Sequence, residues 1–317
     1  MPMPGLILSE PMTPGKSVDN QVEKKMVKTK KGTIGSFRNN LDIKTLLPPD
    51  LHSDIFDPIP DNLDVGSLIT IPESHGRHYL NNAAFGRAYD DVLSLSNKLR
   101  NFAETNPDTF YDQACLPLVD YTYQVLENFF GTDQMVLVPN CTLGLRSVME
   151  RLVKSGDHRV MAQLSPIYGA TQKLMEYYRV NGIIDKVTVV IMKCSDVNEF
   201  LQVLKISPGR GHSELLEEDP HVIFEALEDA FAMQEFSVLF CDQVASQTGR
   251  ILPLEPVIRF CRENKIVLVV DGTQSCQQFF GKNKQHILNC DYFVLSTHKW
   301  ISNVKELFIM NVNATTI

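Results

Sequence analysis

Lys299 stands in the run Ser296-Thr297-His298-Lys299, directly after the apolar residues 293–295. A lysine amine can form a Schiff base with an aldehyde, and neighbouring hydroxyl and imidazole groups can hold a phosphate. A lysine at such a position is more often simply solvated. What it does therefore depends on what the ends of the other predicted strands carry.

A carboxylate follows another apolar run. Residues 266–270 are strongly apolar and lead into Asp271, which Gly272, Thr273 and Gln274 follow. An aspartate that ends a buried strand is costly unless it meets a cation or hydrogen-bond donors. A protonated pyridine nitrogen is one such partner, and a capping role for the carboxylate is the simpler alternative.

Two further apolar runs are also followed by polar residues. After residues 136–138, Asn140, Cys141 and Thr142 open a helical pattern, where free backbone N–H groups favour an anion. An ordinary helix cap is the simpler interpretation. Residues 238–241 lead into a turn with three polar residues and a glycine, and an ordinary turn explains them equally well. These turn residues are Asp242, Ser246, Thr248 and Gly249.

Short apolar runs alternate with helical periods along the chain, which predicts an α/β fold. The sheet is expected to be mostly parallel and flanked by helices on both faces. Ligands in such sheets bind beyond the carboxyl ends of the strands, where the four polar groups stand. The expected strands are 136–138, 187–192, 237–241, 266–270, 293–295 and 307–310, and the expected helices are 143–152, 225–232 and 256–262.

The chain divides into two parts by composition. Residues 1–75 are rich in Pro, Gly, Ser and Lys, which predicts a mobile, disordered N-terminal tail and linker. Residues 76–317 carry the alternating pattern and are expected to form one large domain. Within it, residues 207–220 have the composition of an exposed insertion.

Composition limits the functional classes. The net charge of -8 disfavours nucleic acid and anionic membranes as partners, and no apolar stretch reaches the ~20 residues of a membrane span. The seven cysteines show no metal-ligand or disulfide spacing, and no secretory signal is visible, so a cytoplasmic protein without a metal is expected. Nucleotide-binding glycine loops are also missing from the sequence.

Four segments together resemble the class V aminotransferases, a family that includes cysteine desulfurases. The isopenicillin-epimerase-like branch is the most similar, and the resemblance covers about residues 76–311. It implies the large domain of a fold type I transferase with pyridoxal 5'-phosphate (PLP) as its cofactor. The segments are Tyr79-Leu80-Asn81-Asn82-Ala83-Ala84-Phe85-Gly86, Ser246-x-Thr248-Gly249-x-x-x-Pro253, Asp271-Gly272-Thr273-Gln274-Ser275 and Thr297-His298-Lys299-Trp300.

The resemblance implies a role for most of these residues. Lys299 resembles the catalytic lysine that bonds to the cofactor, and Asp271 the carboxylate that keeps the pyridine nitrogen protonated. Gln274 and Ser246 resemble the contacts to its phenolic oxygen, and Asp242 is counted with the cofactor-binding residues. The expected phosphate ligands are Cys141, Thr142, Ser296 and His298.

Three residues are expected at the border of the site. Tyr168 lies close to where the family stacks an aromatic ring on the cofactor, and a core tyrosine is the equal alternative. Asn81 and Asn82 lie in the segment that borders the substrate in the family.

The sequence also departs from the family's pattern. Residues 301–305 replace the usual Pro-Lys-Gly-type turn, and the sequence ends at Ile317, soon after Lys299. The family continues into a small domain that supplies the arginine for the substrate carboxylate and, in desulfurases, a nucleophilic cysteine. We therefore expect the C-terminal small domain to be missing or truncated and the activity of this chain alone to be weak.

Two functional hypotheses follow. The first is a homodimeric PLP enzyme acting at Cα of a small amino-acid substrate, by transaminase, epimerase or cysteine lyase/desulfurase chemistry. The second is a truncated, non-catalytic protein that keeps the PLP fold and acts through partner binding. The cofactor residues favour the first, and the missing domain favours the second.

Overall fold

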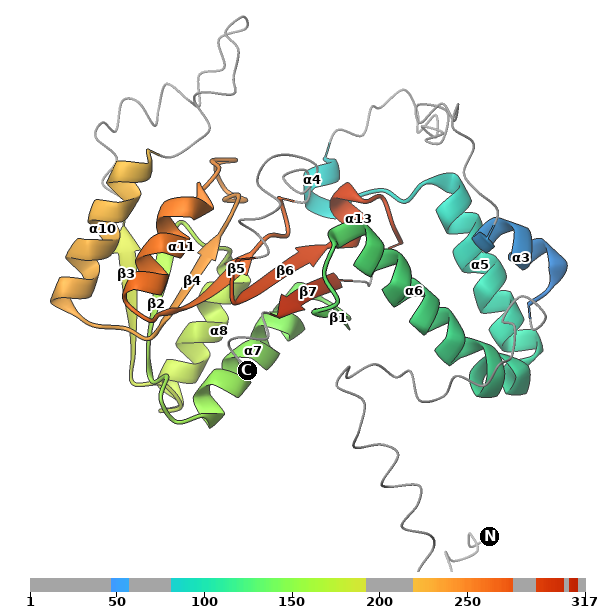
Figure 1. The fold of residues 1–317 in the computed structure, drawn as a ribbon, viewed down its shortest axis with the longest axis horizontal. Coiled ribbons are helices and arrows are strands. Elements are labelled where there is room, and N and C mark those ends of the chain that lie inside the picture. The colour runs from blue at the N-terminus through green and yellow to red at the C-terminus, as the bar shows by residue number, and fades with distance from the viewer. Residues whose placement is uncertain (1–46, 57–80, 192–218, 276–288, 305–307, 313–317) are drawn as a thin grey trace, which may run out of the picture.

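The computed structural model describes residues 47–56, 81–191, 219–275, 289–304 and 308–312. Its centre is one seven-stranded sheet with helices on both faces (Figure 1). The strands are β1 (Met135–Val138), β2 (Val160–Ser165), β3 (Lys186–Ile191), β4 (Val238–Asp242), β5 (Val267–Asp271), β6 (Tyr292–Ser296) and β7 (Phe308–Val312). The helices are α3 (Pro49–Phe56), α4 (Asn82–Phe85), α5 (Asp90–Thr105), η2 (Thr109–Ala114), α6 (Cys115–Phe130), α7 (Cys141–Lys154), α8 (Gly169–Val180), α10 (Pro220–Met233), α11 (Leu254–Glu263) and α13 (Thr297–Trp300).

The strand order is β1-β7-β6-β5-β4-β2-β3. All neighbouring strands from β6 to β3 pair in parallel, and β7 is antiparallel to both β6 and β1. The α/β fold with a mostly parallel sheet between helices is thus confirmed. Every expected strand is present, and the antiparallel direction of β7 was not predicted.

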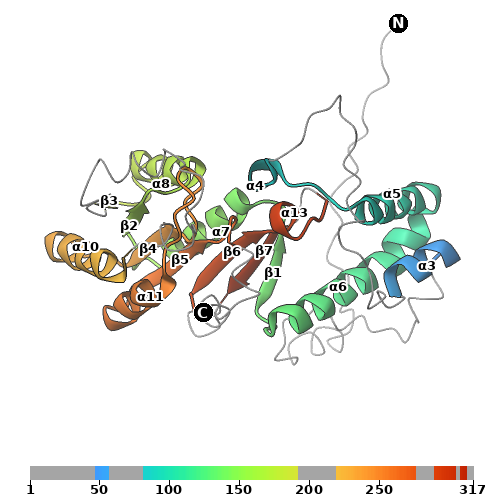
Figure 2. The ribbon, with the colours of Figure 1, turned by 90° about the horizontal axis from the view of Figure 1, so that it is seen from above.

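Two layers of helices bury the two faces of the sheet. Seen from above, α7 and α8 lie on one side and α10 and α11 on the other (Figure 2). Side chains along β4 alternate between the layers: Leu239 and Cys241 belong to the core under α10 and α11, whereas Val238 and Phe240 belong to the core under α7 and α8. This burial on both faces explains why the parallel strands are apolar throughout.

The same alternation decides which way the polar residues at the strand ends face. Asp242 continues the row of Val238 and Phe240, and Asp271 continues the row of Val269. Successive side chains on a strand point to opposite faces, so both carboxylates lie on the α7 side of the sheet. They are also paired in register, because Asp242 stands opposite Asp271 across β4 and β5.

Part of the expected mobile tail is helical. Helix α3 falls within residues 1–75, and Leu47 and Leu51 are buried in a small cluster with Phe102 and Ala114. The expectation of a tail without structure is wrong for residues 47–56, because the two leucines gain apolar partners on α5 and η2. The rest of the expected tail and most of the expected insertion lie outside the described residues. Figure 1 shows α3, α5 and α6 as a group beside the sheet.

No helix in the described part of the chain is long and apolar enough to cross a membrane.

The end of β5 depends on close packing against Phe293. The Phe293 ring is fully buried under α11 and lies against Gly272, where a β-carbon would overlap the ring. We expect Phe293→Ala to lower the free energy of unfolding by about 3–5 kcal/mol through loss of buried area and the cavity left behind. Denaturant unfolding measures this. Met233→Ala, which removes an exposed side chain, should change stability by less than about 0.5 kcal/mol. Equal effects of the two substitutions would contradict the assigned packing.

Candidate active site

A cavity of about 230 Å³ lies at the carboxyl ends of the parallel strands. This is the edge of the sheet where ligands of α/β proteins bind. The lining side chains come from the ends of β4 and β5, from the starts of α7, α8 and α13, and from α4. They are Ala84, Asn140, Cys141, Thr142, Leu145, Tyr168, Thr171, Asp242, Val244, Ser246, Asp271, Thr273, Gln274, His298 and Lys299.

Helix α7 points its N-terminus into this cavity. Asn140 caps the helix by accepting a 2.8 Å hydrogen bond from the Leu143 backbone N–H, while Cys141 and Thr142 line the cavity. The N-terminal backbone N–H groups of a helix and its dipole favour a bound anion. The start of α7 is therefore the end of the cavity that favours an anion.

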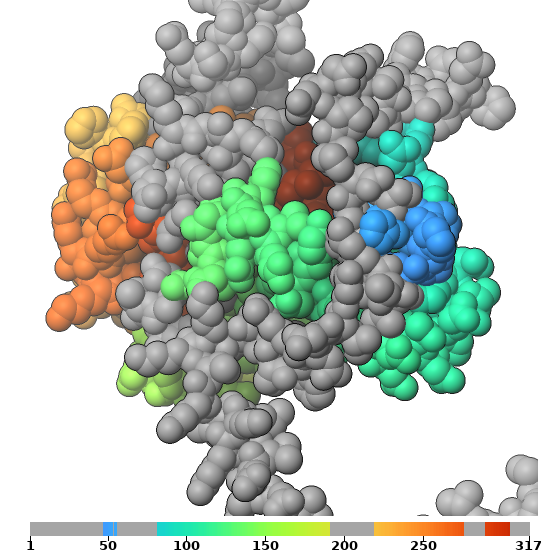
Figure 3. Space-filling view, turned by 45° about the vertical axis from the view of Figure 1, so that its right-hand side comes forward, coloured from blue at the N-terminus to red at the C-terminus, as the bar shows by residue number. Residues whose placement is uncertain are grey.

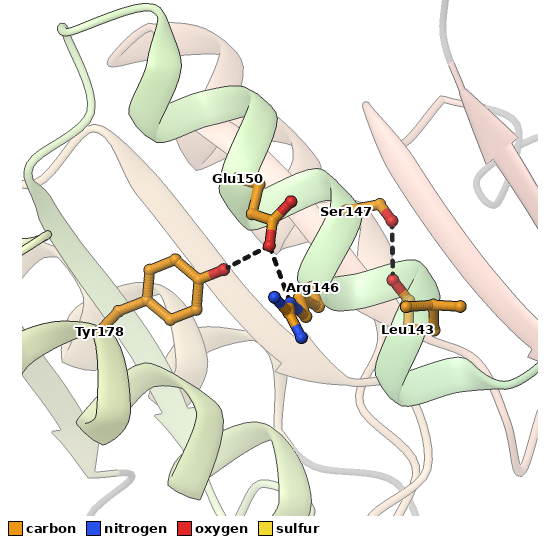
Figure 4. A network of polar contacts seen from close by, with 5 residues as sticks. All are labelled: Leu143, Arg146, Ser147, Glu150 and Tyr178. Atoms are coloured by element: carbon orange, nitrogen blue, oxygen red, sulfur yellow. Dashed lines mark hydrogen bonds and ion pairs between the residues drawn. The ribbon is translucent and has the colours of Figure 1, made fainter. Parts of the chain in front are cut away.

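Polar contacts on the outer surface of α7 join this helix to α8 (Figure 4). Glu150 accepts a 2.8 Å hydrogen bond from Arg146 Nε and a 3.2 Å hydrogen bond from the Tyr178 hydroxyl, which belongs to α8. Arg146 holds the pKa of the Glu150 carboxyl below its usual value. Exposed ion pairs contribute little to stability, so the buried apolar face of α7 supplies most of its anchoring.

Asp271 is held in a fixed orientation at the end of β5. Its Oδ1 accepts a 2.9 Å hydrogen bond from the Thr273 backbone N–H, and its Oδ2 lies 3.4 Å from the Cys141 sulfur, which donates to it. Burial, with the nearby charge of Asp271, raises the pKa of the Cys141 thiol well above its usual value. The thiol thus stays protonated and serves as a donor to the carboxylate.

Asp242 places a second buried carboxyl beside the first. Both carboxyl groups are only 6% exposed and line the same cavity. Burial and the charge of Asp271 raise the pKa of Asp242 to about 8, and a hydrogen bond to the Tyr168 backbone partly opposes the shift. The Asp242 carboxyl therefore favours its protonated form near neutral pH, because two buried carboxylates repel each other.

Lys299 approaches the cavity from β6. This strand ends at Ser296, and the one-turn helix α13 carries Lys299 and His298 to the cavity wall. Burial lowers the pKa of the Lys299 ammonium, while Asp271 and Cys141 oppose the shift. A lowered pKa raises the fraction of neutral amine, which is the nucleophilic form.

The backbone of α4 packs directly on α13. Gly86 ends α4 with φ 65° and ψ 173°, a conformation that is nearly exclusive to glycine. A β-carbon there would overlap the His298 carbonyl and stand 2.9 Å from the Lys299 Cα. Figures 1 and 2 both show α4 beside α13, and the dark red surface from the C-terminal part of the chain is visible in the space-filling view (Figure 3). The position of Lys299 thus depends on a glycine distant in sequence.

The structure brings nine of the residues expected from the sequence to the cavity: Cys141, Thr142, Tyr168, Asp242, Ser246, Asp271, Gln274, His298 and Lys299. Ser296 is not among the lining residues. It is fully buried, and its hydroxyl donates a 3.2 Å hydrogen bond to the Thr273 carbonyl, so its position does not support a phosphate contact. Asn81 and Asn82 are exposed at α4 and also do not line the cavity.

Six further lining residues were not among the expected site residues: Ala84, Asn140, Leu145, Thr171, Val244 and Thr273. Ala84 lines the cavity because α4 packs on α13. The sequence around Ala84 does not predict this contact. Thr171 is polar, 3% exposed and one turn into α8, a helix that was not predicted. Thr273 stands within the Asp271 motif and could have been included with it.

A substitution at Gly86 tests the contact between α4 and α13. We expect Gly86→Ala to lower the free energy of unfolding by roughly 1–3 kcal/mol, because the methyl group overlaps His298 and the backbone conformation is strained. Thermal unfolding measures the change. Gly169→Ala is the matched control, since no atom lies within 4 Å of the added carbon. Wild-type stability of the Gly86 variant would show that α4 does not pack as described.

The raised pKa of Asp242 predicts how stability depends on pH without bound ligand. Because about 8 lies above the usual 3.8, the folded state binds more protons than the unfolded chain between these pH values. Stability should therefore fall as the pH rises toward about 8, by at most about 1.4 kcal/mol per pH unit, and level off above it. Denaturant unfolding between pH 5 and 9 measures the slope. Asp242→Asn should flatten it, and the exposed Asp157→Asn should not; equal slopes would contradict the assignment.

Comparison with known proteins finds a family match for one segment of the chain and solved structures of similar fold. Residues 215–303 match the profile of the family described as Aminotransferase class-V. Similar solved structures include a NifS-like protein (TM-score 0.56, 16% identity), covering 75% of this chain and 59% of that one. Another is a C-DES mutant with glycine covalently linked to its PLP cofactor (TM-score 0.56, 14% identity), with 75% and 57% covered. A third is the cysteine desulfurase of Thermococcus onnurineus NA1 (TM-score 0.55, 12% identity), with 78% and 58% covered.

The TM-scores show a shared fold, and at such low identities the likeness shows no more than the fold. The chain spans less than two thirds of the length of each of these structures. The family match covers the segment that carries both Asp271 and Lys299. Residues 215–303 of this chain thus match the class V aminotransferase family, and the likeness to the solved structures is one of fold.

Proposed function

We propose that the cavity holds PLP through the chain's own residues and that the protein acts at Cα of an amino-acid substrate. The observation that carries the proposal is the presence of the Lys299 amine and the Asp271 carboxylate in one cavity, next to the start of α7. These three features supply an amine for an aldehyde, an anion for a pyridinium and donors for a phosphate.

Groups left open in the cavity fit such a ligand. Asp242 Oδ1 and Gln274 Oε1 are buried and have no hydrogen-bond partner within the described parts of the chain. Buried polar atoms are nearly always paired, so atoms of this kind at a cavity wall indicate a bound partner. The two buried carboxyl groups of Asp242 and Asp271 also favour a cation at this end.

Different residues would hold different parts of the cofactor. Asp271 would hold the protonated ring nitrogen, with its carboxylate oriented by Thr273 and Cys141. The backbone N–H groups at the start of α7 and the Thr142 hydroxyl would hold the phosphate. Tyr168, which is half-exposed at the start of α8, would cover the ring.

Lys299 would hold the aldehyde end and then move protons. When bound, PLP withdraws electrons from the bonds at Cα of an amino acid. The Lys299 amine would take or return the Cα proton, and its burial favours the neutral form that can act as a base. Lys299 and Asp271 would thus act at opposite ends of the same ring.

The choice among transaminase, epimerase and cysteine lyase or desulfurase chemistry stays open within this proposal. We also propose a homodimer, because large apolar side chains near the cavity are exposed: Phe85 by 60% and Leu143 by 41%. A cytoplasmic location is proposed on the free thiols of the described cysteines, which form no disulfide among themselves.

Covalent trapping tests the proposed cofactor site. Purified protein mixed with PLP should show a visible absorption band, and borohydride reduction should fix the cofactor to Lys299, as located by peptide mass spectrometry. Lys299→Ala should abolish the adduct, whereas Lys154→Ala, at the far end of α7, should leave it intact. An adduct on another lysine, or none on folded protein, would overturn the proposal.

A further inference from the structure

One side chain at the cavity ties α4 to the end of β5. Gln274 Nε2 donates a 2.8 Å hydrogen bond to the backbone carbonyl of Ala83. Gln274 follows β5 in the loop that begins at Asp271, and Ala83 belongs to α4. The bond therefore connects the loop that orients the carboxylate with the helix that packs on Lys299.

Helix α4 needs contacts of this kind because it cannot be stable alone. It is four residues long, none of which is buried. Its backbone bonds are short-range, from the N–H groups of Ala84 and Phe85 to Asn81 and of Gly86 to Asn82. Isolated helices of this length do not form in water, so α4 depends on α13 and on Gln274.

The Gln274 amide has further hydrogen-bonding capacity that points to the cavity. It carries two N–H donors and one oxygen, and the bond to Ala83 uses one donor. The oxygen is buried without a partner within the described residues, and the side chain lines the cavity beside Ala84. A ligand in the cavity can thus meet this amide while Ala83 stays bonded.

We propose that Gln274 is a positioning residue that couples the bound cofactor to α4. One N–H holds Ala83, and the rest of the amide contacts the cofactor, so that cofactor binding orders the α4 wall of the cavity. This inference rests on the proposed PLP site. By linkage the coupling is reciprocal, so whatever stabilises α4 also strengthens binding of the cofactor.

Hydrogen–deuterium exchange of the peptide covering residues 81–86 measures this coupling, with and without PLP. Gln274→Glu keeps the shape of the side chain, but its carboxylate cannot donate to the Ala83 carbonyl. In the cofactor-free protein we expect the amides of Ala84, Phe85 and Gly86 to exchange about fivefold faster in this variant, the effect of one lost hydrogen bond. PLP should slow exchange of the peptide in the wild-type protein and leave it nearly unchanged in the variant.

Two further variants make the test specific. Gln274→Met removes the same donor without adding a charge near Asp271, and it should give the same result; it also serves if Gln274→Glu does not fold. Gln247→Glu is the matched control. Gln247 Nε2 donates a 2.9 Å bond to the Ile167 carbonyl in another loop, so its loss should leave exchange at residues 81–86 unaltered.

PLP binding is followed separately, by absorbance and by trapping on Lys299. If PLP is trapped there but α4 exchanges alike in the wild-type and Gln274 variants, the coupling is wrong and the proposed function stands. Protection of α4 by PLP that persists in both Gln274 variants also overturns the coupling. If the wild-type protein takes up no PLP, the proposed function fails, and the coupling fails with it.

Discussion

Burial of two neighbouring carboxylates is the constraint on which the rest of the site depends. Asp242 and Asp271 stand opposite each other at the ends of β4 and β5, and both are nearly inaccessible to solvent. An isolated charge in such a place is costly, and two like charges are costlier. A proton on Asp242 reduces the cost, and a cation at Asp271 would reduce it further. The Cys141 thiol, the Thr273 N–H group and the Lys299 amine all surround this pair.

Much of this arrangement could be predicted from the sequence because it follows from alternation along strands. Parallel strands buried on both faces are continuous apolar runs, so β4, β5 and β6 stand out. A polar residue that ends such a run must lie at the ligand-binding edge. This reasoning places Asp242, Asp271 and Lys299 correctly, since each lies at or just after a strand end.

The misses have physical causes as well. Ser296 ends its strand like Asp271, but its hydroxyl donates to the Thr273 carbonyl and the residue does not line the cavity. The direction of a strand depends on the tertiary fold. The sequence of the antiparallel strand β7 therefore has the same apolar pattern as the parallel strands. Helix α3 lies in a polar segment, and its two buried leucines meet partners on α5 and η2. The local sequence does not predict that Ala84 lines the cavity or that Gln274 bonds to Ala83, because both contacts join segments far apart in the chain.

The pairing of β1 bears on the order in which the site can assemble during synthesis. β1 leads into α7, whose N-terminus lines the cavity, and within the described sheet β1 pairs with β7 alone. Met135 stands opposite Asn311, so the ribosome must make nearly the entire described chain before this strand has its neighbour. Pairing between residues so distant is slow, and strand edges left open meanwhile are prone to aggregation. A nascent chain would thus complete β2, β3, β4 and β5 first and close the α7 end of the cavity last.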